Sequence, residues 1–109
     1  MNDYDLADSG QRTNFESGAM RETEGKLRYD LIPAECLRRS AINLTKGAEK
    51  YGPDNWRKGM STSVFMAALL RHIQAYRLGD RNEDHLAAAL FNIYGLMLFE
   101  DTKWDDLNG

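Results

Sequence analysis

The sequence has little of what marks secreted, disulfide-linked or membrane-spanning proteins. Its single cysteine, Cys36, excludes a disulfide within the chain, which fits a reducing compartment. The longest strongly apolar stretch, residues 86–99, is interrupted by Asn92 and is too short to cross a bilayer. No basic segment followed by an apolar core opens the sequence, so we expect no signal peptide. These absences predict a cytoplasmic protein with no membrane partner.

Several catalytic signatures are also missing. The sequence contains no glycine-rich phosphate loop, no GxSxG motif and no pair of cysteines with zinc-binding spacing. Cys36 is therefore expected to be a small buried residue rather than a nucleophile. Any chemistry must come from a different arrangement of polar side chains.

The net charge of −3 is small, but it is unevenly distributed. Residues 1–25 carry six acids and two arginines, residues 26–81 carry eleven Lys/Arg and five acids, and residues 82–109 carry one lysine and six acids. Proteins that bind duplex nucleic acid are usually basic overall. A basic middle between acidic ends suits a phosphate-bearing small ligand better, so we expect no duplex partner. For any single Lys or Arg, a solvated surface position remains the alternative.

Apolar residues recurring at steps of three and four predict three helices, over about 33–51, 63–78 and 82–99. Ser61 or Thr62 can cap the second helix. The second helix is expected to bury one face, formed by Val64, Ala67, Ala68, Leu70, Ile73 and Tyr76.

The third helix is apolar nearly all round, so it should be the most buried element. Asp80 and Glu83 have the spacing of a capping box for its start. Three helices with little strand signal predict an all-α fold, a small helical bundle with an extended N-terminal segment. So small a bundle is expected to complete its core by forming a homo-oligomer.

A length of 109 residues supports one domain with two flanking segments. Residues 1–24 are polar and acidic and are expected to form a flexible arm. Residues 25–100 form the all-α domain, and its first part, 25–33, is expected to be extended because the residue before a proline avoids helical geometry. Residues 101–109 form an acidic tail, in which Trp104 should fold back onto the body or onto a partner subunit.

Two histidines and one amide stand out as a candidate polar site. His85 and Asn92 share a face of the third helix, and His72 lies on the second. The histidines could be metal ligands, bases or core residues with satisfied hydrogen bonds. Asn92 has apolar neighbours, and a buried amide without a partner costs about 1–3 kcal/mol. It therefore either contacts a ligand or bonds a backbone carbonyl or the His72 ring.

Basic and aromatic side chains near the first loop suit a nucleotide. Charge-assisted bonds to phosphate are strong, and the candidates are Lys46, Lys50, Arg57, Lys58 and Arg71. Tyr51 and Trp56 could stack on a base, although aromatic side chains more often fill a core.

Five segments, taken together in this order, resemble a known family. They are 25–33 (GKLRYDLIP), 47–52 (GAEKYG), 55–59 (NWRKG), 70–72 (LRH) and 83–89 (EDHLAAA) with Asn92. The combination resembles small phage-encoded proteins described as dATP/dGTP diphosphohydrolases, which are related to the MazG-like all-α nucleoside triphosphate pyrophosphohydrolases. The resemblance covers about residues 20–100 and implies that residues 25–100 are a nucleotide-binding domain. If the chain is phage-encoded, it would act in the cytoplasm of an infected bacterium.

The resemblance implies a metal-dependent pyrophosphohydrolase that converts dATP or dGTP to a monophosphate and pyrophosphate. MazG-like enzymes hold Mg²⁺ with carboxylates on two helices, in EExxE and ExxD patterns, whereas residues 61–79 here contain no acid. Mg²⁺ or Mn²⁺ would then be bound by the remaining candidates, Glu35, Glu83, Asp84 and His85. Catalytic roles, as ligand or base, fall to Glu35, Asp84 and His85. Substrate contacts fall to Lys50, Tyr51, Asn55, Trp56, Lys58, Arg71, His72 and Asn92.

Two alternatives remain. The missing EExxE pattern favours a non-catalytic binding module, which would sequester a nucleotide or a nucleotide-derived defence signal. An assembly protein with purely structural polar residues is the third hypothesis. Metal-dependent turnover distinguishes the enzyme from the other two, and stabilisation by ligand distinguishes the binding module from the assembly protein.

Overall fold

The computed structural model describes residues 12–22 and 24–105. Residues 1–11, 23 and 106–109 lie outside this part, and with them portions of the predicted arm and of the predicted acidic tail. The described residues fall into two units, one up to Ile32 and one from Pro33 onward.

The first unit contains a hairpin that the sequence did not predict. Strands β1 (Thr13–Asn14) and β2 (Met20–Arg21) pair in antiparallel fashion, with Thr13 opposite Arg21. The turn between them includes Gly18, whose φ of 91° is easily adopted only by glycine. Two residues per strand are too few to leave an alternating pattern in the sequence.

A short 3-10 helix, η1 (Tyr29–Leu31), replaces part of the segment predicted to be extended. A proline restricts only the residue before it, and Ile32 is indeed extended, with φ −78° and ψ 122°. Arg28, the residue just before η1, bonds to a residue of this helix: its Nε and Nη2 each donate to the Asp30 carboxylate at 2.8 Å. The prediction was therefore wrong for the three residues of η1.

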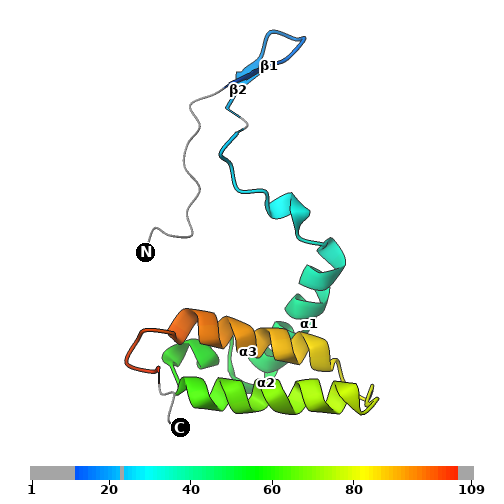
Figure 1. Cartoon of the computed structure of the whole chain (residues 1–109), viewed down its shortest axis with the longest axis vertical. Helices are drawn as coiled ribbons and strands as arrows, with labels where there is room; N and C mark the ends of the chain where they lie inside the picture. The colour runs from blue at the N-terminus through cyan, green and yellow to red at the C-terminus, as the bar shows by residue number, and fades with distance from the viewer. Residues whose placement is uncertain (1–11, 23, 106–109) are drawn as a thin grey trace. The chain divides into compact units, whose positions relative to one another are not determined.

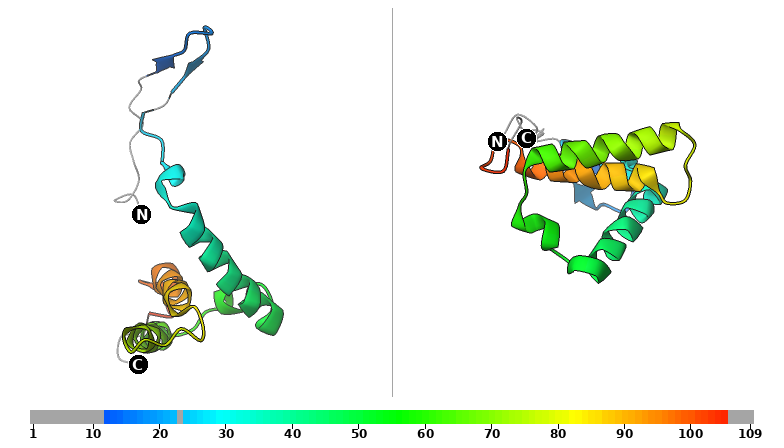
Figure 2. Two further views of the ribbon diagram at one scale, coloured as in Figure 1. Left: turned by 90° about the vertical axis from the view of Figure 1, so that its right-hand side faces the viewer. Right: turned by 90° about the horizontal axis from the view of Figure 1, so that it is seen from below.

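The second unit consists of three helices, as predicted: α1 (Ala34–Tyr51), α2 (Thr62–Arg77) and α3 (His85–Phe99) (Figure 1). A 3-10 turn, η2 (Asn55–Lys58), lies between α1 and α2. Helices α2 and α3 run antiparallel and side by side, and α1 packs against α3 (Figure 2). The all-α class is confirmed, while assembly into a homo-oligomer stays a prediction.

The helix ends follow from local capping. Gly52, with φ 94°, ends α1, and the Ser61 hydroxyl caps α2 by accepting from the Ser63 N–H at 3.2 Å. The predicted start of α3 at Asn82 was wrong. Its N-cap is Asp84, which accepts from the Ala87 N–H at 3.0 Å.

Helices α2 and α3 approach closely around Phe65, which is 1% exposed. Its ring lies directly over Gly95, where any Cβ would collide with it. The prediction that α3 is the most buried helix is confirmed. The predicted buried face of α2 was wrong: Val64, Ala67, Leu70 and Tyr76 are exposed, and Ala68 and Ile73 are half-buried. The helix instead buries Thr62 and Phe65. That helix is apolar on several sides, so its pattern alone does not select the face that packs.

Helix α1 meets α3 through a hydrogen bond between the buried Ser40 hydroxyl and the Tyr94 hydroxyl, 3.0 Å apart. Cys36, predicted to be buried, is exposed, because it borders an open depression beside Leu86 rather than the packed core.

Trp104 folds back onto the helices, as predicted. Its carbonyl accepts from the Thr62 N–H at 2.9 Å, and its ring covers Gly59, where a Cβ would overlap the indole. Among the helices of the described residues, none combines the length and hydropathy that a membrane span requires.

Candidate functional site

The candidate site lies where α2 turns into α3. The connecting loop carries Asp80, Glu83 and Asp84, and α3 opens with His85. His72 reaches the same place from α2. This end of the α2–α3 pair is joined by the yellow loop in Figure 1.

The two histidines face each other. The Nδ1 atoms of His72 and His85 are 2.9 Å apart, and the His85 side chain is 5% exposed. Two imidazole nitrogens at this distance need one proton or one cation between them, because two lone pairs would repel.

Asp80 determines which nitrogen of His85 faces His72. The Asp80 Oδ2 atom lies 3.0 Å from His85 Nε2. The pKa of Asp80 is held below its usual range, first by the Asn82 backbone N–H and then by the His85 ring. An ionised carboxylate only accepts, so His85 Nε2 donates to it. When the His85 ring is neutral, its Nδ1 carries a lone pair, and His72 Nδ1–H is the donor of the contact between the two rings.

Glu83 completes a group with metal-binding potential. Its Oε1 atom lies 3.7 Å from His85 Nδ1, and its side chain is 60% exposed. One ligand atom each from His72, Glu83 and His85 lies within 4.8 Å of the others. These three residues could hold a metal ion with two nitrogens and one oxygen.

A cavity of about 440 Å³ opens beside this cluster. It is lined by Arg39, Tyr76, Arg81, Glu83, Asp84, His85 and Leu86. Three helices or their ends therefore contribute to one space that combines two guanidinium groups, two carboxylates and one imidazole.

Arg39 reaches this cavity from α1 and forms an ion pair with Asp84. Its Nε and Nη2 donate to the two Asp84 oxygens at 2.8 and 2.6 Å. This pairing, helped by the Ala87 N–H, lowers the pKa of Asp84 to about 2 despite some desolvation. Asp84 is thereby kept ionised at the N-terminus of α3, a position that favours negative charge.

Arg81 is held in place by its surroundings. Its Nη1 donates to the carbonyls of Tyr76 and Asp80, each at 3.0 Å, and its guanidinium lies 3.9 Å from the Tyr76 ring centroid. A guanidinium has five N–H groups, so others can still donate to a ligand in the cavity.

The residues predicted to bind substrate around the first loop lie elsewhere. A second depression, of about 460 Å³, involves Tyr51, Asn55 and Lys58. Trp56 is half-buried, with its ring edge-on to Phe91 at 5.2 Å. Residues 39 and 51 of α1 are separated by about 18 Å of helix, so this depression does not adjoin the histidine cluster.

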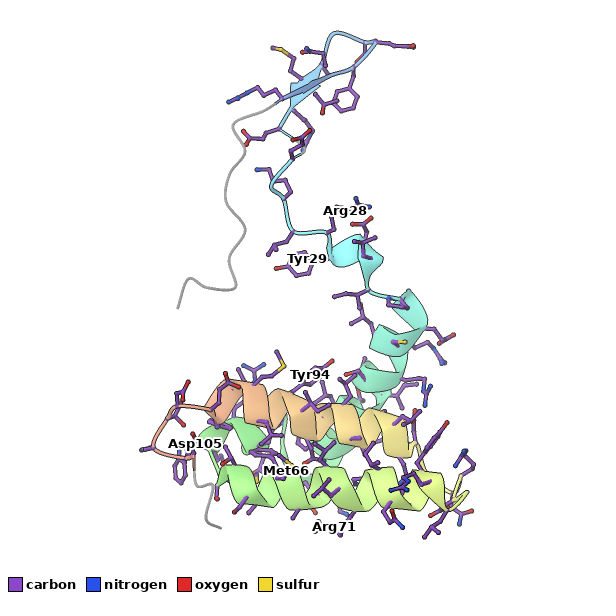
Figure 3. All side chains as sticks on the ribbon, in the orientation of Figure 1. Arg28, Tyr29, Met66, Arg71, Tyr94 and Asp105 are labelled. Atoms are coloured by element: carbon purple, nitrogen blue, oxygen red, sulfur yellow. The ribbon has the colours of Figure 1, made fainter. Side chains whose placement is uncertain are left out.

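Other predicted residues are also dispersed. Lys50 lies at the last turn of α1, and Glu35 lies in its first turn, 3.7 Å from Arg38. Arg71 is exposed on α2 (Figure 3). It borders a shallow apolar surface whose lining shares no residue with the cavity. Asn92 is buried, and its Nδ2 donates to the Ala88 carbonyl at 2.8 Å, which is the backbone bond considered from the sequence. Of the predicted ligands, Glu83 and His85 come together, joined by His72.

Sequence reasoning missed four residues of the site: Arg39, Tyr76, Asp80 and Arg81. Asp80 was noticed only as a possible cap. Tyr76 and Arg81 are five positions apart around a helix end, a spacing that gives no periodic signal. Arg39 is linked to Asp84 across 45 positions, and only the packing of α1 brings them together.

A comparison with known protein families finds a match for this chain. The family described as "dATP/dGTP diphosphohydrolase, N-terminal" matches residues 16–106, which is most of the chain. No curated protein and no solved structure matches.

Proposed function

Because this chain belongs to the dATP/dGTP diphosphohydrolase N-terminal family, we propose that it binds a purine deoxynucleoside triphosphate and cleaves it to a monophosphate and pyrophosphate. The observation that carries the proposal is the cavity in which Arg39 and Arg81 lie beside Glu83 and His85. Guanidinium groups match phosphate oxygens in charge and shape.

Arg81 is the main phosphate contact in this proposal. Tyr76 and two backbone carbonyls already hold its guanidinium, so little side-chain entropy is lost when a phosphate binds. Two N–H groups of Arg39 already donate to Asp84. Arg39 therefore contributes mainly its positive charge, which attracts and orients the phosphates.

A triphosphate in this cavity would need a cation to neutralise its charge. The charges of Arg39 and Arg81 balance those of Glu83 and Asp84, so these four residues carry no net charge. A triphosphate brings several negative charges into the same space. A divalent ion, Mg²⁺ or Mn²⁺ in our expectation from the sequence, would neutralise them and activate water.

The proposed reaction uses this arrangement in the following way. A water molecule near His85 and Glu83 attacks the α-phosphorus, the bond from this phosphorus to the bridging oxygen breaks, and pyrophosphate leaves. The proton of the water passes to solvent through the open cavity. Asp84 is a poor base, since Arg39 holds its pKa near 2, and its role is to cap α3 and to orient Arg39.

Binding without cleavage is the second candidate function. It is favoured by one observation: α2 brings an imidazole to the cavity region but no carboxylate. Such a protein would sequester a nucleotide or a nucleotide-derived signal.

Product analysis separates the two. The protein would be incubated with dATP, dGTP, ATP and GTP, each with Mg²⁺ or Mn²⁺, and the products followed by ³¹P NMR. Monophosphate and pyrophosphate from dATP or dGTP support the enzyme. Intact nucleotide that raises the melting temperature supports the binding module. If no nucleotide gives a product and none raises the melting temperature, both candidate functions are rejected.

A further inference from the structure

We propose that His72, Glu83 and His85 form a binding site for a first-row transition-metal ion such as Zn²⁺, Co²⁺ or Mn²⁺, and that Asp80 positions His85 to bind it. The ion would bind whether or not a nucleotide is cleaved, so this inference goes beyond the proposed hydrolysis and is tested without nucleotide.

The spacing of the two imidazoles supports the site. Metal–nitrogen bonds are about 2.0–2.1 Å, so two nitrogens on one ion at angles of 90–110° lie about 2.8–3.4 Å apart. The Nδ1 atoms of His72 and His85 are 2.9 Å apart. The separation of the two nitrogens therefore already matches that of two ligands on one ion.

The third ligand can adjust. Glu83 Oε1 is 3.7 Å from His85 Nδ1, and the Glu83 side chain is 60% exposed, so it is not held in place by packing and can turn toward the ion. The site would thus have one buried rigid side, formed by His85, and one exposed adaptable side, formed by Glu83.

Asp80 supplies the outer partner that metal-binding histidines usually have. A ligating imidazole commonly donates its other N–H to a carboxylate, which fixes its tautomer and orientation. His85 makes this contact, with Nε2 3.0 Å from Asp80 Oδ2. Asp80 is itself fixed by the Asn82 N–H, 2.9 Å from its Oδ1.

The donor set determines the class of metal. Imidazole suits Zn²⁺, Co²⁺, Ni²⁺ and Fe²⁺, and a carboxylate extends the range to Mn²⁺. Mg²⁺ prefers a nearly complete oxygen shell, which this cluster does not offer. The cluster differs from the ligand set expected from the sequence, because it includes His72 and not Glu35 or Asp84. Glu35 lies beside Arg38, and Asp84 is paired with Arg39.

The test measures metal binding to the full chain without an affinity tag. Cys36→Ser serves as the parent, since an exposed thiolate would also bind Zn²⁺ and Co²⁺. Calorimetry should show one site for Zn²⁺ and Co²⁺ that excess Mg²⁺ does not displace. Pulsed EPR of bound Mn²⁺ should detect imidazole nitrogen. The chain has two histidines, both in this cluster, so such a signal identifies the site.

Variants test each residue. Glu83→Gln, at an exposed position, should lower Zn²⁺ affinity 10-fold or more while the circular dichroism stays that of the parent. His72→Asn should abolish the site. Glu100→Gln, a change of another exposed carboxylate just after α3, is the matched control and should bind like the parent.

Asp80 is tested as a positioning residue. Asp80→Asn should lower Zn²⁺ affinity about 10–100-fold and alter the visible spectrum of bound Co²⁺, and Asp80→Glu should recover part of both. Unchanged affinity in Glu83→Gln and His72→Asn, or Mn²⁺ bound without nitrogen coupling, would overturn the metal site. An Asp80→Asn variant with parental affinity and Co²⁺ spectrum would overturn the role of Asp80.

Discussion

Arg39 and Asp84 form a two-pronged ion pair that joins α1 to the N-cap of α3 across 45 positions of sequence. The same carboxylate caps α3 through the Ala87 N–H. One side chain therefore fixes both the start of α3 and the approach of α1, and the wall of the cavity depends on both.

The first prediction separates these two roles of Asp84. Asp84→Ala removes cap and ion pair and should reduce the free energy of unfolding by about 0.5–2 kcal/mol, mostly from the cap. Asp84→Asn keeps a capping oxygen and should lose less, because an exposed ion pair contributes little. Urea denaturation measures both. An equal loss of unfolding free energy in the two variants would contradict the larger contribution assigned to the cap.

The second prediction concerns the close contact of α2 and α3. Gly95→Ala places a methyl group against the Phe65 ring and should destabilise the fold by about 1–3 kcal/mol. Gly47→Ala is the matched control on α1, where nothing lies within 4 Å of an added Cβ. It should be neutral or stabilise by up to about 1 kcal/mol. Thermal unfolding measures the stability of both variants. A Gly95→Ala protein as stable as the parent would contradict the close contact between Phe65 and Gly95.

The third prediction tests the phosphate contact. Arg81→Gln should weaken binding of dATP or dGTP about 10-fold or more, because a charged donor facing the phosphates is lost. Arg77→Gln, four positions earlier and outside the cavity lining, removes the same charge and should bind like the parent protein. Calorimetric titration compares them. A similar loss in both variants would indicate a general charge effect instead.

The fourth prediction concerns the C-terminal segment. Gly59 has φ 104° and lies under the Trp104 indole, so Gly59→Ala should strain the backbone and displace the ring. In a Trp56→Phe background, the Trp104 fluorescence should shift to longer wavelength as the ring meets water. Fluorescence identical to that of the Trp56→Phe protein would argue against the docked position.

The sequence predicted the helices well because their signals are local. Gly52 and Ser61 mark helix ends through their own backbone and side-chain preferences, and Ser61 caps α2 as expected. The start of α3 was misplaced by three residues, since Asp80 and Asp84 are both able to cap and only the fold selects between them.

The site was only partly predictable. Glu83 and His85 could be named because they stand together in the sequence, and His72 lies one helix earlier. The residues that they contact could not be named, because those contacts depend on the tertiary structure. Arg39 comes from another helix, and Asp80 reaches His85 only because the loop turns back. Loop residues such as Asn55 and Lys58 were grouped with the histidines by chemistry, while the structure places them around a different depression.

The exposure of Cys36 gives the molecule a convenient handle. It is the chain's single thiol, it stands one helical turn before Arg39, and it borders the depression that also touches Arg39 and Leu86. A fluorescent maleimide would therefore attach at one defined point near the cavity wall without any engineered cysteine. A change in its emission would then indicate ligand binding or movement where α1 meets α3.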